Sequence, residues 1–187
     1  DTCTPPILPE GMTYDEVKAF FVKNFTEMAD EAAEYGFDVV WEFEPGFMIN
    51  EPKNVKWILD HVTAPNFSLL FDTCHAYNCA LGHRHIEAGC KLEGSVNEFI
   101  DMVAGRIGLV HLIDCDGTLN DTGTSTHAPF GDGNIDFDSV IPHLLNEGGY
   151  KGDWWAIDLC EWPNAWAVTE DCFKFVDALN KKYCKDC

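Results

Sequence analysis

The sequence lacks long apolar runs and is poor in positive charge. None of its apolar stretches approaches the roughly 18 residues that a membrane-spanning helix needs. Only 12 lysine and arginine residues oppose 32 aspartate and glutamate residues, which gives a formal net charge of −20. Because a surface of this sign repels phosphate backbones and anionic lipids, we expect neither a nucleic-acid partner nor a membrane. A divalent cation or a neutral polyol meets no such barrier.

Linkers, internal repeats and low-complexity segments are also absent from the 187 residues. The hydrophobic content of 46% is ordinary for a globular protein, so we expect one domain over residues 1–187. The nine cysteines form an odd number without the spacing of a disulfide scaffold. Such cysteines are typical of free thiols in a reducing compartment, and a cytoplasmic location is therefore expected.

What the sequence does contain is a regular alternation of helix and strand signals. A first helix is predicted over residues 14–35, where apolar side chains recur at helical spacing between Thr13 and Gly36. Four strand–helix pairs follow. The predicted strands are 37–45, 66–73, 108–114 and 153–159, and the predicted helices are 51–62, 95–107, 137–146 and 168–182. The strands are almost continuously apolar, which is typical of parallel sheets with both faces covered.

The predicted loops are long after the strands and short before them. The long ones cover residues 46–50, 74–94, 115–135 and 160–167. Long loops at the carboxyl ends of parallel strands are where α/β proteins place their sites. Four such strands do not close a barrel. We expect a parallel (β/α) barrel of the TIM type covering about the last four βα units, with an open sheet as the alternative. The other strands would be missing from the sequence or supplied by a partner chain or a second copy, because bare strand edges invite pairing.

Each predicted strand carries a metal-type ligand near its carboxyl end. These residues are Glu44, Asp72, His111 and Asp158. Three carboxylates and one imidazole suit a single divalent ion, of which Mn²⁺ is our first expectation and Mg²⁺, Co²⁺ or Zn²⁺ are alternatives. Glu42 shares a strand face with Glu44 and is an alternative ligand. Glu161 is an alternative to Asp158 if the last strand runs further.

Some of these residues also have simpler explanations. Asp72 could be a turn residue or the cap of a following helix. Asp114 and Asp116 are expected to order their loop rather than to do chemistry. His83 and His85 are expected in solvent or on the rim of a pocket.

The ligand-bearing segments resemble the xylose-isomerase-like barrel superfamily, which contains sugar (phosphate) isomerases and epimerases, inosose dehydratases and zinc-dependent apurinic endonucleases. The matching segments are WEFEPGF around Glu44, LLFDTCH around Asp72 and His75, GLVHLID around His111, and STHAPFGDGNIDF around His127. The resemblance covers essentially the whole chain and corresponds to the second half of the barrel.

The resemblance implies metal ligation by Glu44, Asp72 and His111. It implies a substrate contact by His75, whose position is a metal ligand in the endonucleases, and contact of His127 with substrate or a further metal. The family usually has a Glu as its fourth ligand, and this sequence has Asp158 there. An Asp carboxylate is one methylene shorter, so it can hold a metal yet fall short of a substrate carbon.

The function implied is a metal-dependent isomerase or epimerase of a sugar or sugar phosphate that works through an enediolate. Glu44, Asp158 and His75 are the expected catalytic residues, and Trp162 is expected to stack on the sugar. One alternative is elimination on a sugar or an oxidised glycoside, and another is a non-catalytic fragment or binding subunit. An apurinic endonuclease is disfavoured by the acidic charge and by Ser125, where that subfamily has a ligand Asp.

Overall fold

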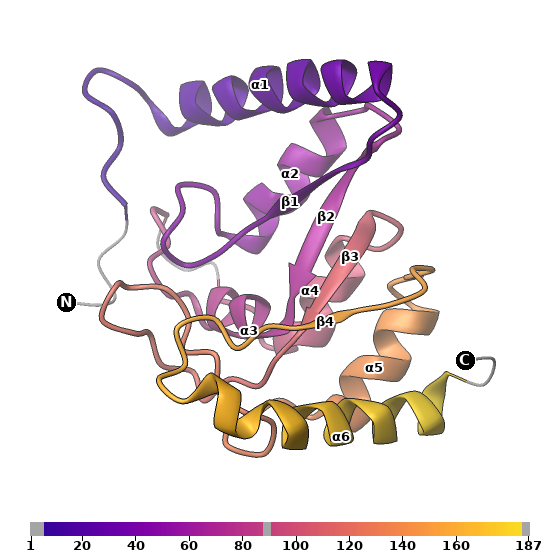
Figure 1. The fold of residues 1–187 in the computed structure, drawn as a ribbon. Coiled ribbons are helices and arrows are strands. Elements are labelled where there is room, and N and C mark those ends of the chain that lie inside the picture. Colours follow the sequence, from indigo (N-terminus) through magenta and orange to yellow (C-terminus); the bar gives the residue numbers. More distant parts are fainter. Residues whose placement is uncertain (1–5, 88–90, 185–187) are drawn as a thin grey trace.

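The protein is described from a computed structural model over residues 6–87 and 91–184. Four parallel strands form one sheet in the order β1-β2-β3-β4 (Figure 1). The strands are β1 (Val39–Glu42), β2 (Phe67–Asp72), β3 (Ile107–Leu112) and β4 (Ala156–Ile157). This topology confirms the predicted half of a parallel α/β barrel.

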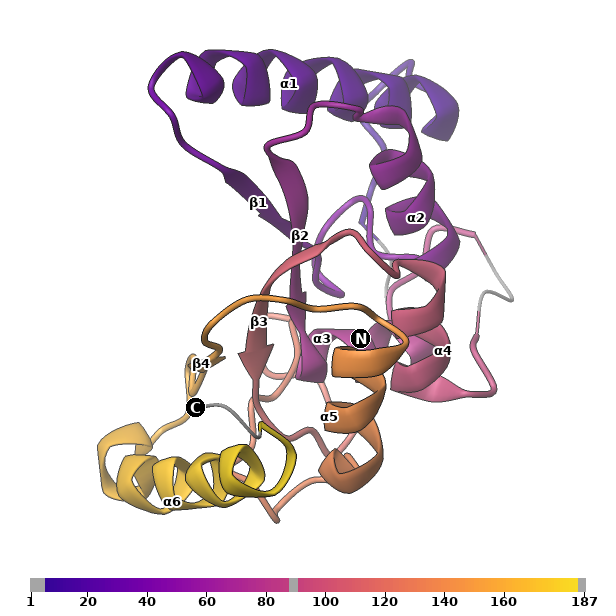
Figure 2. The ribbon, with the colours of Figure 1, turned by 90° about the vertical axis from the view of Figure 1, so that its right-hand side faces the viewer.

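The helices form a layer along one face of the sheet. They are α1 (Tyr14–Glu34), α2 (Pro52–His61), α3 (Thr73–Leu81), α4 (Ser95–Met102), α5 (Phe137–Asn146) and α6 (Ala165–Tyr183). Helices α1 and α6 lie at the two ends of the sheet, and α2, α4 and α5 lie between them on the same side (Figures 1 and 2). Helix α1 packs against α2, α2 against α4, α4 against α5 and α5 against α6, and α3 also packs against α4.

The two faces of the sheet are covered unequally. Trp41, Leu69 and Val110 point toward the helices and are buried in the main hydrophobic core. On the other face Val40 is 38% exposed, and Ser68 and Leu109 are only partly buried. The sequence predicted strands covered on both faces, but within the described residues only one face is covered. The open face is the one that would line the interior of a complete barrel.

Helix α1 begins where the sequence predicts it. Thr13 Oγ1 accepts a hydrogen bond from the Glu16 backbone N–H, and Glu16 Oε2 accepts one from the Thr13 N–H. This reciprocal capping satisfies two backbone donors that the first turn would otherwise leave unpaired.

Helix α3 corrects the prediction of a long loop over residues 74–94. Almost every side chain of α3 is buried, so the segment has no apolar stripe that would mark it as a surface helix. Its start is fixed by Asp72, whose Oδ1 accepts a hydrogen bond from the His75 N–H at 2.8 Å. Its end is fixed by Gly82, which adopts the left-handed conformation at φ 89°.

Other predicted elements are also shorter in the structure, and the first strand, expected over 37–45, is limited to Val39–Glu42. The last strand was expected over 153–159, but only Ala156 and Ile157 pair with β3, and β4 forms one edge of the sheet among the described residues. The helix expected over 95–107 ends at Met102, since Gly105 turns the chain with φ 74° and Ile107 already belongs to β3.

Two further predictions concern membrane-spanning helices and the state of the cysteines. Among the described residues, no helix is long and apolar enough to cross a membrane. The six described cysteines all carry free thiols, as the sequence predicts.

Candidate functional site

The carboxyl ends of the four strands stand side by side. Asp72 of β2 lies opposite His111 of β3, and His111 lies opposite Ala156 of β4. Because alternate residues of a strand share a face, Glu42, Asp72, His111 and Asp158 all emerge toward the open face of the sheet.

These four side chains converge on the imidazole of His111. The His111 Nδ1 atom lies 3.3 Å from Glu42 Oε1, 3.8 Å from Asp72 Oδ2 and 3.5 Å from Asp158 Oδ2. One ligand atom from each of the four residues lies within 4.8 Å of all the others. We call this set the strand-end cluster.

The cluster contains Glu42 and not Glu44, which the sequence pattern predicted there. Glu42 is the last residue of β1, so its carboxylate projects directly from the sheet. Glu44 lies two residues beyond that end. Its Oε2 atom accepts a hydrogen bond from Thr124 Oγ1 at 2.5 Å and lies 3.6 Å from His75 Nε2. The structure thus places Glu44 beside His75, at the edge of the cluster.

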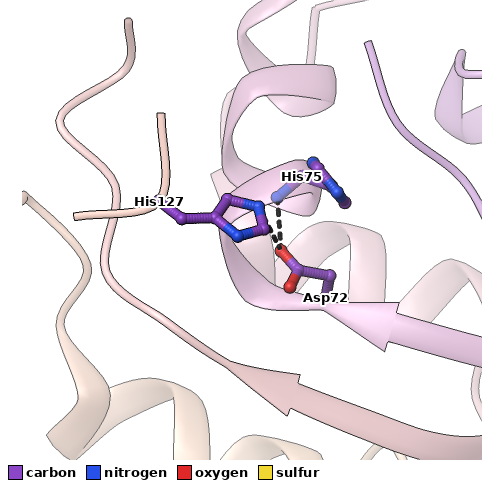
Figure 3. Close-up of side chains that lie close together, drawn as sticks. All are labelled: Asp72, His75 and His127. Carbon is purple, nitrogen blue, oxygen red and sulfur yellow. Dashed lines mark hydrogen bonds and ion pairs between the residues drawn. The ribbon is translucent and has the colours of Figure 1, made fainter. Parts of the chain in front are cut away.

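A second group shares Asp72 with the first. Asp72, His75 and His127 also present ligand atoms within 4.8 Å of one another, and Figure 3 shows both imidazoles beside the carboxylate. His127 Nε2 lies 3.9 Å from Asp72 Oδ1, and His127 Nδ1 lies 3.4 Å from Asp158 Oδ2. His75 Nδ1 is 2.9 Å from the hydroxyl of Ser125.

The electrostatics of the cluster follow from burial and proximity. Burial raises the pKa of Asp72 to about 7. The nearby carboxylates of Asp158 and Glu42 raise the pKa of His111 to about 10. Burial opposes protonation of His127, but Asp158 and Asp72 raise its pKa to about 9. Burial also opposes ionisation of Asp158, yet His111 and His127 hold its pKa well below the usual range.

The pKa values of His75 and Glu44, next to the cluster, are shifted mainly by burial. Burial lowers the pKa of His75 well below its ordinary value, so this imidazole is neutral near pH 7. Burial raises the pKa of Glu44, although the hydrogen bond from Thr124 acts in the opposite direction. Glu44 and Asp158 are therefore two carboxylates whose surroundings push their pKa values apart, which is a common property of acid–base sites.

Several cluster atoms are buried without a hydrogen bond, and this fits a divalent ion. Within the described residues, Glu42 Oε1, Asp72 Oδ2 and His111 Nδ1 have no hydrogen-bond partner. Buried polar atoms are normally paired, so these three call for a ligand. Two ligands of an ion at about 2.1 Å lie about 3–4 Å apart. The contacts of 3.3 and 3.8 Å around His111 Nδ1 match that spacing.

Three other residues that the sequence singled out are Trp162, Glu161 and Asp114. Trp162 and His127 line the same cavity next to it. Glu161 accepts a hydrogen bond from Asn120 and lies outside the cluster. Asp114 orders its loop, because its carboxylate accepts backbone hydrogen bonds from Gly131, Gly133 and Ile135.

Sequence reasoning missed two hydroxyl residues that hold the site in place. Thr73 Oγ1 donates to the Ile113 carbonyl at 2.7 Å and accepts from the Ile113 N–H at 2.9 Å, which joins the ends of β2 and β3. Thr124 holds Glu44. Neither belongs to a motif, and their roles depend on contacts 40 and 80 residues apart along the chain.

Comparison with known proteins agrees with the fold. A profile of the xylose isomerase-like TIM barrel family matches residues 2–174. Among solved structures, the IOLI protein with a zinc atom is 24% identical with a TM-score of 0.69, and the match covers 96% of this chain and 62% of that one. D-allulose 3-epimerase from Methylomonas sp. is 22% identical with a TM-score of 0.63, covering 94% and 59%.

A curated relative matches a shorter stretch. The probable endonuclease 4 of Methanoculleus marisnigri is 34% identical over 93 residues, which are 49% of this chain and 32% of that protein. The chain thus spans about a third of this relative and about three fifths of the two solved structures. The profile covers nearly the whole chain, and the chain belongs to the xylose isomerase-like TIM barrel family.

Proposed function

We propose that this protein is a divalent-metal-dependent sugar isomerase or epimerase that works through an enediolate. The observation that carries the proposal is the strand-end cluster. Glu42, Asp72, His111 and Asp158 converge from four successive strands, and three of their ligand atoms are buried without a hydrogen bond. A mixed carboxylate–imidazole set suits Mn²⁺, Mg²⁺, Co²⁺ or Zn²⁺.

The cluster residues would hold the ion, and the neighbouring residues would handle the proton. A bound ion polarises a substrate carbonyl and so acidifies the adjacent C–H bond. We assign proton transfer to Glu44, which Thr124 fixes at 2.5 Å and which lies outside the ligand set. His75 lies 3.6 Å from Glu44 and would bind a substrate hydroxyl. Asp158 would stay ionised between two imidazoles and serve as a ligand.

The relatives support the reaction class. Two structural neighbours are named as a D-allulose 3-epimerase and a 3-keto-D-glucoside 4-epimerase. A third was solved with a zinc atom, and a fourth was solved in complex with magnesium. Elimination after the same C–H abstraction is the close alternative, since a neighbour is named a probable 3-DHS dehydratase.

A second candidate function is hydrolysis of a phosphodiester. It is favoured by the carboxylate of Asp72, which belongs to both ligand groups and could bridge two ions, and by the likeness to a probable endonuclease 4. The net charge of −20 opposes binding of a nucleic acid. The two functions differ in metal stoichiometry. The isomerase needs one ion, whereas hydrolysis with Asp72 as a bridging ligand would use two.

The test is solvent deuterium exchange into ketoses, followed by NMR with Mn²⁺-loaded protein. We expect exchange at the carbon next to the carbonyl in the wild type and its loss in Glu44→Gln. Glu31→Gln is the matched control, because Glu31 is exposed on α1. Equal exchange in both variants would refute the role of Glu44. Absence of exchange with every ketose, together with cleavage of an abasic-site oligonucleotide, would replace the isomerase with the hydrolase.

A further inference from the structure

A cavity lies beside the strand-end cluster and is not part of it. Its volume is about 380 Å³. One wall comes from the loop that leads to His127 and includes Asn120, Thr122 and Thr126, and the other comes from Glu161 and Trp162 after β4. His127 also lines the cavity, and its Nδ1 atom lies 3.4 Å from Asp158 Oδ2 of the cluster. A substrate held at the cluster would therefore extend into this cavity.

The polar groups of the cavity wall are held in position by one another. Thr122 Oγ1 donates to Asn120 Oδ1 at 2.7 Å, and Asn120 Nδ2 donates to Glu161 Oε2 at 2.6 Å. Thr118 Oγ1 donates to Thr126 Oγ1 at 3.0 Å. Hydroxyl, amide and carboxylate groups at fixed positions are suited to the hydroxyls of a sugar, which can both donate and accept.

The charge of the cavity wall is negative. Asp121 and Glu161 are among its lining residues, and no lysine or arginine is. Arg84 reaches the same loop, but its Nη1 atom donates to the carbonyl of Gly123 at 2.6 Å. Proteins that bind phosphate supply arginine, lysine or free backbone N–H groups at a helix N-terminus. A phosphate in this cavity would meet like charge from Asp121 and Glu161 and no lysine or arginine side chain, and the imidazole of His127 is already paired with the carboxylate of Asp158.

The indole of Trp162 supplies an apolar part of the cavity wall. Trp162 is partly buried and lines the cavity, whereas Trp166, on the first turn of α6, is 93% exposed and does not. An indole face offers an apolar surface on which the C–H face of a sugar ring can stack. Trp166 therefore provides a matched control for Trp162 within the same short segment.

We propose that this cavity binds the non-reacting end of an uncharged sugar by stacking on Trp162, and that the site rejects phosphorylated sugars. This inference rests on the proposed function, because it assigns the reacting end of the same sugar to the strand-end cluster. It narrows the substrate class from sugars and sugar phosphates to neutral sugars.

Binding can be measured apart from catalysis. Tryptophan fluorescence and calorimetry would follow titration of Mn²⁺-loaded protein with D-fructose, D-allulose and D-fructose 6-phosphate. We expect the neutral ketoses to bind at least tenfold more tightly than the phosphate. Trp162→Ala should lower that affinity at least tenfold, Trp162→Phe should restore most of it, and Trp166→Ala should change it less than twofold. Circular dichroism would confirm that Trp162→Ala folds.

The outcomes separate this inference from the proposed function. Tighter binding of D-fructose 6-phosphate, or equal losses in Trp162→Ala and Trp166→Ala, would overturn the inference even if deuterium exchange is observed. Neutral-sugar binding that depends on Trp162, but without exchange, would support the inference and overturn the isomerase. Failure of all three sugars to bind would overturn the inference.

Discussion

Asp72 and His111 face each other in register across β2 and β3, with Asp72 Oδ2 3.8 Å from His111 Nδ1. The carboxylate is completely buried, and its two oxygens have different roles. Oδ1 caps α3 through the His75 N–H, while Oδ2 points into the strand-end cluster without a hydrogen bond among the described residues. The same side chain thus fixes a helix and completes a candidate metal site.

The first prediction separates the two glutamates of the first strand region. Glu42→Gln should weaken Mn²⁺ binding by more than about 100-fold, since removing a ligand costs more than removing a group that only supports one. Glu44→Gln should weaken binding by no more than about tenfold, the lower end of the cost of losing a group outside the ligand set. Calorimetric titration of both variants with Mn²⁺ checks this. A larger loss in Glu44→Gln would return the ligand role to Glu44.

The second prediction concerns the protons that the cluster releases when it binds a metal. The pKa of Asp72 is about 7 and that of His111 about 10, so at pH 7 the first is about half protonated and the second fully protonated. A metal must displace these protons, so binding should release between about one and two of them. Since raising the pH removes the competing protons, affinity should rise from pH 6 to pH 9. Calorimetry in buffers of different ionisation enthalpy measures the number of protons released. An affinity for Mn²⁺ that does not change with pH would contradict the prediction.

The third prediction separates the two roles of Asp72. Asn caps helices as well as Asp does, so Asp72→Asn should preserve α3. It should also remove a buried charge, so the metal-free protein should keep its stability within about 1 kcal/mol or gain some. Mn²⁺ should raise the melting temperature of the wild type but not of this variant. Asp72→Ala is the comparison, since it loses the cap and should destabilise the metal-free protein by about 1 kcal/mol.

The strand ends and the topology could be predicted from the sequence because they depend on local signals. An apolar strand that stops at Asp72 and another that carries His111 next to its end are visible in the chain itself. The end of β1 is less visible in the sequence, which named Glu44 first and left Glu42 as an alternative; β1 ends at Glu42, and the Glu42 carboxylate lies in the cluster. Helix α3 was missed because a helix buried on nearly all sides has no amphipathic period.

The fourth prediction concerns the shortened ligand at position 158. We expect Asp158→Glu to crowd the cluster, because Asp158 Oδ2 already lies 3.5 Å from His111 and 3.4 Å from His127. A misplacement of about 1 Å should lower the deuterium-exchange rate by on the order of 100-fold. Equal or faster exchange in Asp158→Glu would instead show that this residue reaches the substrate as a second base.

The fifth prediction is that the sheet edges are covered in the working protein, by a second copy or by a partner chain. The outer edges of β1 and β4 have no strand neighbour among the described residues, and Phe37 and Trp154 near them are 66% and 62% exposed. Native mass spectrometry should show an assembly heavier than one chain. The double change Phe37→Ser and Trp154→Ser should weaken it, whereas Ile7→Ser, at an 88% exposed position, should not. A stable monomer would contradict this prediction.

The loop that carries His127 is tied to both outer strands. Thr124 binds Glu44, which follows β1, and Asn120 binds Glu161, which follows β4. A change in the distance between the first and last strands would therefore move this loop, and His127 with it. Whatever closes the open side of the sheet would then also adjust the spacing between His127 and Asp158. In that case the position of His127 and the spacing of the strand-end cluster, which runs from Glu42 of β1 to Asp158 after β4, would both depend on how the sheet is completed.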